Sequence, residues 1–160
     1  MAREITAEDY RALADLRYRI RHFLRDGDAV ARAAGLEPQQ YQLLLMIRGL
    51  PQGEEATIRT LAERLALRHH SAVGLIDRLE ARGFVHRNRG RDDRRQVLVS
   101  LLPRGERILE KVARRRIDEL HSYGRELASA IEKLLQRAGS SSNGNRRNKI
   151  LKRKVRGNRE

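Results

Sequence analysis

The stretch from Arg68 to Leu101 reads RHHSAVGLIDRLEARGFVHRNRGRDDRRQVLVSL and sets the architecture of the chain. Its first half repeats apolar residues at helical spacing, which predicts a helix that ends at Gly83. The apolar positions of this helix are Ala72, Leu75, Ile76 and Leu79. Two extended runs follow, on either side of a loop crowded with charge at residues 87–95. The stretch therefore predicts a helix followed at once by a β-hairpin with a basic tip.

A helix that runs directly into such a hairpin is the layout of a winged helix. In that layout the helix enters a DNA major groove, and the hairpin reaches phosphates or the adjacent minor groove. Upstream, Thr57 is a good cap for a short helix over 58–65, and about four residues join it to the central helix, as in a helix-turn-helix. We therefore predict a mostly α fold with a small β-hairpin wing (α+β). Residues 36–102 would form a winged helix-turn-helix DNA-binding lobe, with the wing at 84–101.

The lobe opens with a helix that we expect to run from Pro38 to Leu50, because proline is typical of the first helical turn. Helical spacing places Tyr41, Leu44 and Leu45 on its core face. The sequence Pro51-Gln52-Gly53 then ends the helix.

An amphipathic helix precedes the lobe. Thr6 and Asp9 have the spacing of a capping box, which predicts a helix start there. We expect this helix to bend or break at Gly27-Asp28 and its continuation to end at Gly35. Its apolar stripe, which we expect to pack as core or against a second copy, consists of Tyr10, Leu13, Leu16 (or Arg17), Ile20, Phe23 and Leu24.

Helical patterns also follow the hairpin. Pro103 opens a helix that we expect to break at Ser122-Tyr123-Gly124, before a last amphipathic helix. Amphipathic helices at both chain ends suit a two-fold dimer. We therefore predict a homodimer whose dimerisation helices lie at 5–35 and 103–138.

Composition and charge narrow the range of partners. The 160 residues carry a formal net charge of +14, and the pI is about 11.2, which predicts a polyanionic partner: double-stranded DNA before an anionic membrane surface. There is no cysteine, which excludes disulfides and thiolate metal sites. No apolar run approaches the roughly 20 residues of a membrane span, and the start MAREITAEDY does not resemble a signal peptide. We expect a cytoplasmic, nucleoid-associated protein with no membrane partner.

From residue 139 the composition changes to GSSSNGNRRNKILKRKVRGNRE. Eight basic residues and one acidic residue, Glu160, give this segment a formal charge of +7, half of the total. Its apolar content is too small for a packed core, so we predict a disordered basic tail over 139–160. Two interpretations stay open: a basic arm that adds non-specific DNA affinity, and a tail without a selected role.

The span from about Ile5 to Gly139 resembles the MarR family of bacterial transcription regulators. The resemblance rests on LAERLALRHHSAVGLIDRLEARGFVHR, on the wing sequence DDRRQVLVSL, and on the Pro-x-Gly at Pro103 and Gly105. It implies residues 1–138 as a winged helix domain that acts as a sequence-specific transcriptional regulator, a repressor, on a pseudo-palindromic operator. In the family's wing pattern, Arg95 would enter the minor groove while Asp93 orients it. The alternative is an architectural, nucleoid-type DNA-binding protein without sequence specificity.

The predicted DNA contacts come from the start of the central helix, from its exposed side and from the wing. Gly74 stands where the family often has a longer side chain, so base readout would depend on the neighbouring positions. The predicted DNA-binding residues are Arg68, His69, His70, Ser71, Arg78, Arg87, Arg89, Arg91, Asp93, Arg94 and Arg95.

The resemblance also implies a small anionic or phenolic effector, bound between the dimerisation helices and the DNA-binding lobe. The candidate pocket residues near that junction are Arg17, Arg21, His22 and Tyr41. The alternative is that the two arginines are solvated and that the tyrosine belongs to the core.

Other chemistries fit the sequence less well. His69 and His70 are neighbours on a helix and point about 100° apart, so they would not easily share one metal ion. Asp92-Asp93 is flanked by arginines and is better explained as part of a salt-bridged wing than as a catalytic pair. RNA recognition usually needs exposed aromatic residues, and we assign Phe84 to the core. We therefore expect no enzyme activity, no cofactor and no metal. A pure protein-interaction adaptor is a further alternative.

Overall fold

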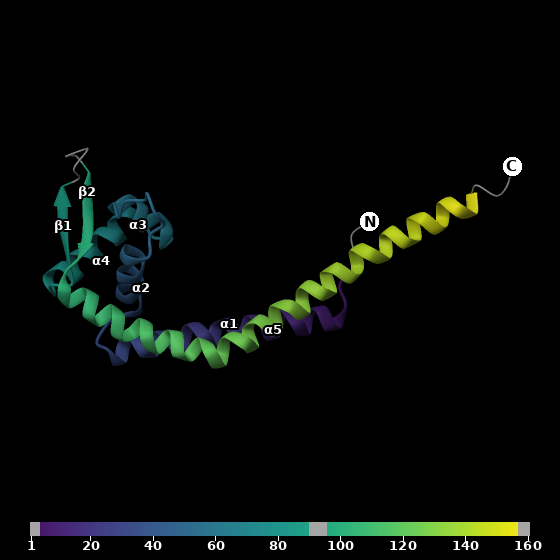
Figure 1. Cartoon of the computed structure of the whole chain (residues 1–160), viewed down its shortest axis with the longest axis horizontal. Helices are drawn as coiled ribbons and strands as arrows, with labels where there is room; N and C mark the ends of the chain where they lie inside the picture. The colour runs from purple at the N-terminus through teal and green to yellow at the C-terminus, as the bar shows by residue number, and fades with distance from the viewer. Residues whose placement is uncertain (1–3, 90–95, 157–160) are drawn as a thin grey trace. The chain divides into compact units, whose positions relative to one another are not determined.

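The structure is a computed structural model that describes residues 4–89 and 96–156, the last eighteen of these as backbone. The chain divides into two compact units, one made of Met1–Leu24 with Glu119–Glu160 and the other of Arg25–Asp118. Figure 1 labels the elements along the chain. They are α1 (Ala7–Ala33), α2 (Pro38–Arg48), α3 (Ile58–Arg64), α4 (His69–Ala81), β1 (Val85–Arg89), β2 (Val97–Leu101) and α5 (Pro103–Arg156). The predicted fold, mostly helical with a two-stranded wing, is confirmed.

The unit of residues 25–118 is organised around an aliphatic core. One face of α4 and both strands contribute to it, together with α2, α3 and the ends of α1 and α5 that lie in this unit. Its most completely buried large side chains are Leu36, Leu43, Leu44, Leu61, Leu75, Ile76, Leu79, Phe84, Val85 and Val112. Full burial of each such side chain contributes about 1.5–3 kcal/mol relative to exposure. α4 and the hairpin therefore pack against the same hydrophobic core.

The helix-turn-helix follows from local capping. Thr57 accepts a hydrogen bond from the backbone N–H of Thr60 (3.0 Å) and so caps α3, as predicted. The chain then turns through Ala66, whose φ of 51° is in the left-handed region. The backbone N–H of Leu67 donates to Ala62 O (2.9 Å) across this turn, and α4 begins directly afterwards.

The end of α4 positions the wing. Gly83 has a φ of +69°, and the N–H of Phe84 reaches back to Leu79 O (3.0 Å), which closes the helix as the sequence predicts. β1 and β2 then pair antiparallel, from Val85 opposite Leu101 to Arg89 opposite Val97. The N–H of Val99 donates to Ala56 O (2.9 Å), so β2 is also tied to the segment before α3.

The other unit contains the N-terminal part of α1 and the C-terminal part of α5. Thr6 and Asp9 form the predicted capping box: the Asp9 N–H donates to the Thr6 hydroxyl (3.3 Å), and the Thr6 N–H donates to the Asp9 carboxylate (2.9 Å). Arg137 donates to Asp9 (3.0 Å), and Arg19 forms an ion pair with Glu126. Because the later residue of α1 pairs with the earlier residue of α5, the two helices run antiparallel in this unit.

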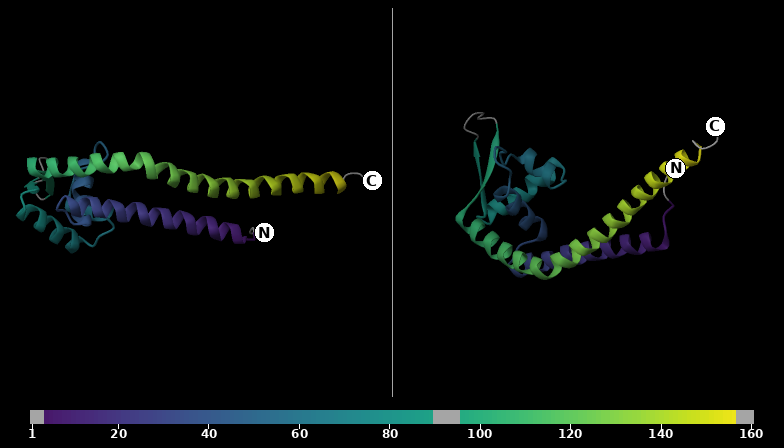
Figure 2. Two further views of the ribbon diagram at one scale, coloured as in Figure 1. Left: turned by 90° about the horizontal axis from the view of Figure 1, so that it is seen from below. Right: turned by 45° about the vertical axis from the view of Figure 1, so that its right-hand side comes forward.

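Two predicted helix breaks are wrong. α1 continues through Gly27-Asp28 to Ala33, and α5 is one helix across Ser122-Tyr123-Gly124, as Figure 2 shows. A glycine inside an established helix costs only about 1 kcal/mol relative to alanine, which packing can offset. A Cβ on Gly27 would lie 2.8 Å from the Arg116 guanidinium, which is the flexible end of its side chain and can move aside.

The segment after residue 138 also differs from its prediction. The sequence predicts disorder over 139–160, whereas α5 continues to Arg156. Extending an existing helix adds one hydrogen bond per residue without a new nucleation step, so a polar stretch can prolong it.

The core face of α2 is shifted from its prediction. Leu43 and Leu44 are both buried, whereas Leu45 is 37% exposed and Tyr41 is half-buried. Helical spacing alone did not show which of Leu43 and Leu45 is buried, because both residues are adjacent to Leu44 in the sequence.

Candidate nucleic-acid interface

The N-terminus of α4 is open to solvent. Arg68 is the N-cap, and its side chain makes no capping hydrogen bond. His69, His70 and Ser71 are exposed in the first turn, which contains no acidic residue. The first N–H groups of a helix carry partial positive charge and attract anions. The end of α4 can therefore meet a phosphate or a base edge without opposing negative charge.

The same helix is firmly anchored on its opposite side. Ala72, Leu75, Ile76 and Leu79 are buried, as predicted. Arg78 lies on the exposed side, and a Cβ on Gly74 would meet only the Arg78 guanidinium, at 3.7 Å. The structure thus leaves free space at Gly74, on the turn that follows His70 and Ser71.

Arg87 and Arg89 have different surroundings although both belong to β1. Arg89 is exposed at the last residue of the strand. Arg87 has a side chain that is only 25% exposed and forms ion pairs with Asp77 and Glu80 of α4. Desolvation lowers the pKa of the Arg87 guanidinium, but the hydrogen bonds and charges of the two carboxylates outweigh it, so the pKa is raised.

Asp77 and Glu80 were not identified from the sequence. Their spacing of three residues on one helix was visible, but their partner on the following strand follows only from the hairpin geometry. The predicted wing-tip residues fall outside the residues that the structure describes. These are Arg91, Asp93, Arg94 and Arg95.

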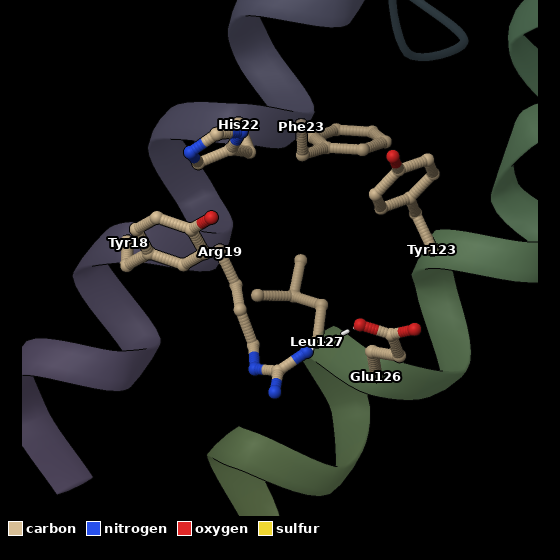
Figure 3. A pocket seen from close by; sticks show the side chains of 7 residues that line it. All are labelled: Tyr18, Arg19, His22, Phe23, Tyr123, Glu126 and Leu127. Carbon is tan, nitrogen blue, oxygen red and sulfur yellow. Dashed lines mark hydrogen bonds and ion pairs between the residues drawn. The ribbon is translucent and has the colours of Figure 1, made fainter.

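A separate pocket of about 430 Å³ lies in the unit that contains the N-terminal part of α1. Figure 3 shows its walls, which come from α1 and α5, with the Arg19–Glu126 ion pair across one side. The rings of Tyr18 and His22 are in contact, with centroids 4.1 Å apart. The pocket is lined by Tyr18, Arg19, His22, Phe23, Tyr123, Glu126 and Leu127.

Only His22 of the four predicted effector residues lines this pocket. Arg17 and Arg21 are exposed on α1, and Tyr41 belongs to the other unit. Burial raises the pKa of the Tyr41 hydroxyl, with the Arg116 charge acting against it. Of the other aromatic residues in the lining, Phe23 was assigned to the packing stripe and Tyr123 to a helix break, and Tyr18 was not singled out.

Residues 4–89 and 96–156 contain no group of three or more His, Cys, Asp or Glu side chains that could hold a metal ion. Within the same ranges, no helix is long and apolar enough to span a bilayer.

A helix-turn-helix with an adjoining two-stranded wing defines the class of winged helix-turn-helix DNA-binding proteins. The MarR family model matches residues 34–96 of the chain. The uncharacterised HTH-type transcriptional regulator YsmB of Bacillus subtilis (strain 168) is 27% identical over 141 residues, which cover 83% of this chain and 94% of YsmB. The chain is therefore similar to the MarR family of winged helix-turn-helix transcriptional regulators.

Solved structures give the same fold. AbsC, a MarR family transcriptional regulator from Streptomyces coelicolor, superposes with a TM-score of 0.67 at 19% identity, over 89% of this chain and 99% of AbsC. CouR from Rhodococcus jostii RHA1, bound to p-coumaroyl-CoA, superposes with a TM-score of 0.57 at 26% identity, over 75% of this chain and 80% of CouR. The transcriptional repressor CouR has also been solved on a 23-mer DNA duplex; that structure gives a TM-score of 0.60 at 24% identity, over 86% of this chain and 99% of CouR.

Proposed function

We propose that the chain is a homodimeric repressor that binds a pseudo-palindromic operator through α4 and the hairpin. The observation that carries the proposal is the N-terminus of α4, which is exposed, free of acidic residues and rigidly mounted on the core. Its exposed side chains, Arg68, His69, His70 and Ser71, offer hydrogen-bond donors and acceptors of the kind that read base edges. Arg78 and Arg89 would contact the DNA backbone.

The proposed wing contact continues from β1. Arg89 is exposed at the end of the described strand, and the basic residues that follow it extend toward the hairpin tip in sequence. A basic side chain that enters a minor groove next to the major-groove helix would widen the contact surface. Arg95 is the residue we assign to that contact, with Asp93 orienting it.

Exposed apolar side chains support a homodimer. In the unit that holds the two chain ends, ten large apolar residues are more than one-third exposed. Contiguous apolar patches of more than a few hundred Å² are rare on monomeric proteins and often mark an interface. They are Ile5, Tyr10, Leu13, Tyr18, Ile20, Leu24, Leu120, Tyr123, Ile131 and Leu135. A second copy covering these helices would present two α4 helices to DNA, about 34–36 Å apart along one face.

The α1–α5 pocket is our candidate effector site. Its volume of about 430 Å³ suits a small molecule, and aromatic rings with a few polar groups are typical of such sites. CouR supports this because a relative with the same fold binds p-coumaroyl-CoA. An effector would release DNA only if it bound the DNA-incompetent arrangement more tightly.

The effector proposal is testable with p-coumarate and p-coumaroyl-CoA as probes. Binding would raise the unfolding temperature of the wild-type protein, and the increase would disappear in Tyr123→Ala. No shift with either probe would remove phenolic acids and their thioesters from consideration.

Selection from a random duplex library tests the DNA-binding proposal. At about 150 mM salt, where weak phosphate-only binding is suppressed, we expect an enriched inverted repeat with half-sites about one helical turn apart. Binding without any enriched motif would instead favour an architectural protein. Absence of duplex binding would favour an adaptor.

A further inference from the structure

Arg87 lies where the wing meets the reading helix. It is the third residue of β1, opposite Val99 of β2, and its strand continues toward the hairpin tip. Its side chain is 25% exposed, against 57% for Asp77 and 37% for Glu80. The Arg87 side chain is therefore the least exposed of the three, and its guanidinium is already paired with both carboxylates.

Four hydrogen bonds join this one residue to α4. Its Nη1 donates to Glu80 Oε2, and its Nη2 donates to Asp77 Oδ1 (2.5 Å) and Val73 O (3.5 Å). Its backbone N–H donates to Glu80 Oε1 (2.9 Å). The acceptors are spaced by four and three residues, so they lie on one face of α4 along about two turns.

The planar fork of an arginine suits this arrangement. It holds two carboxylates and a carbonyl in fixed directions, whereas an ammonium group acts as a point charge. The contact therefore restrains both the distance and the angle between β1 and α4. The single positive charge of Arg87 also compensates one of the two carboxylate charges on a helix that approaches DNA.

We propose that Arg87 is a positioning residue that holds the wing at a fixed angle to the reading helix, and that it does not itself contact DNA. The inference rests on the proposed function, in which α4 and the wing bind DNA. It assigns Asp77 and Glu80 to the same role. The wing and the helix would then bind as one preorganised surface, without a further entropic cost of ordering the wing.

Arg87→Gln and Arg89→Gln form a matched pair, two residues apart on the same strand. We measure operator affinity as a function of salt concentration. Arg87→Gln should weaken operator binding by about tenfold, a loss within the range of measured interaction energies between coupled residues. The slope of log affinity against log salt concentration should stay unchanged. Arg89→Gln should reduce the magnitude of the slope by about 0.9, because the protein then neutralises one phosphate fewer.

A double-mutant cycle with Arg95→Ala separates positioning from simple damage to the fold. If Arg87 positions the wing, Arg95→Ala should cost less affinity in the Arg87→Gln background than in the wild type. Glu80→Gln should reproduce this coupling, and Arg87→Lys should restore part of the affinity. Urea unfolding of each variant reports any change of stability separately.

Three results would overturn the inference: wild-type affinity of Arg87→Gln, a slope reduced as in Arg89→Gln, or additive effects with Arg95→Ala. The proposed function fails differently. In that case the wild-type protein would show no preference for the selected duplex, or Arg95→Ala would have no effect in the wild-type background, and this inference would fall with it.

Discussion

Gly74 and Gly105 show how the surroundings of a single residue set its tolerance to change. A Cβ added to Gly74 meets only the end of Arg78, at 3.7 Å. A Cβ added to Gly105 would lie 2.0 Å from the backbone oxygen of Phe84, which also accepts a hydrogen bond from Leu102. Replacing Gly74 therefore changes mainly the helix propensity of α4, whereas Gly105 is required because a side chain would clash with the backbone of Phe84.

Gly74→Ala should stabilise the protein by about 1 kcal/mol, because alanine is the better helix former and the added methyl fits. Gly105→Ala should destabilise it by about 3 kcal/mol or more, because backbone must move. Urea unfolding of the two variants checks both values. If Gly74→Ala were less stable than the wild type, the space around Gly74 could not be as open as the structure shows.

Some roles of single residues could be predicted from the sequence because they depend only on adjacent residues. Thr57 and Gly83 were identified from sequence because caps and left-handed turns depend on neighbouring residues. The ion pairs of Arg87 with Asp77 and Glu80 were missed, and the DNA contact predicted for this residue stays a prediction. A basic residue near a wing looks the same in sequence whether it faces a phosphate or two carboxylates.

At the scale of elements, Arg137 fastens the start of α1 to α5. It donates to Glu8 (2.6 Å) and to Asp9 (3.0 Å), the residue that completes the capping box with Thr6. The hydrogen bond from Arg137 and its charge lower the pKa of Glu8 below the ordinary 4.5.

Arg137→Gln should therefore reduce stability at neutral pH, and the deficit should shrink in acid. A carboxylate with a lowered pKa stabilises the fold above its unfolded pKa and loses that contribution as the pH falls through its folded pKa. Urea unfolding of wild type and Arg137→Gln at about pH 7 and about pH 3 measures the change. A deficit that grows in acid would contradict the ion pair. Arg114→Gln, whose partner Glu110 lies four residues away on the same helix, is the control.

The order and type of the elements were predictable, but the continuity of the long helices was not. Periodic apolar residues and terminal prolines located α2, α4 and the start of α5. Gly27 and Gly124 suggested breaks because glycine is a poor helix former, and sequence does not reveal the packing that keeps a helix continuous. The Arg116 side chain that lies against Gly27 comes from nearly ninety positions away.

At the scale of the whole molecule, the proposed dimer assigns a partner to the exposed apolar residues of the chain-end unit. Leu13→Glu should yield a monomer in sedimentation experiments, because Leu13 is 46% exposed and does not support the protomer's own core. Operator affinity should fall by about a hundredfold, the scale expected when the second DNA-binding lobe no longer takes part. Ala14→Glu, an exposed neighbour on α1, serves as control. A dimeric Leu13→Glu would place the interface elsewhere.

The basic C-terminal segment should add affinity without specificity. Deleting residues 140–160 removes eight basic residues and should reduce the magnitude of the salt slope by about 0.9 for each phosphate that the shortened protein no longer neutralises. The selected motif should stay the same. An unchanged slope would mean that the segment does not reach DNA.

In the function proposed above, the N-terminus of α4 reads bases in two symmetric half-sites. The most direct measurement compares wild type and His70→Ala on the selected operator and on all its single base-pair variants. We predict that the wild-type penalty of about 1–3 kcal/mol at one symmetry-related base pair in each half-site disappears in His70→Ala, while penalties elsewhere persist. Uniform weakening at every position, with every wild-type penalty retained, would contradict base readout by this helix.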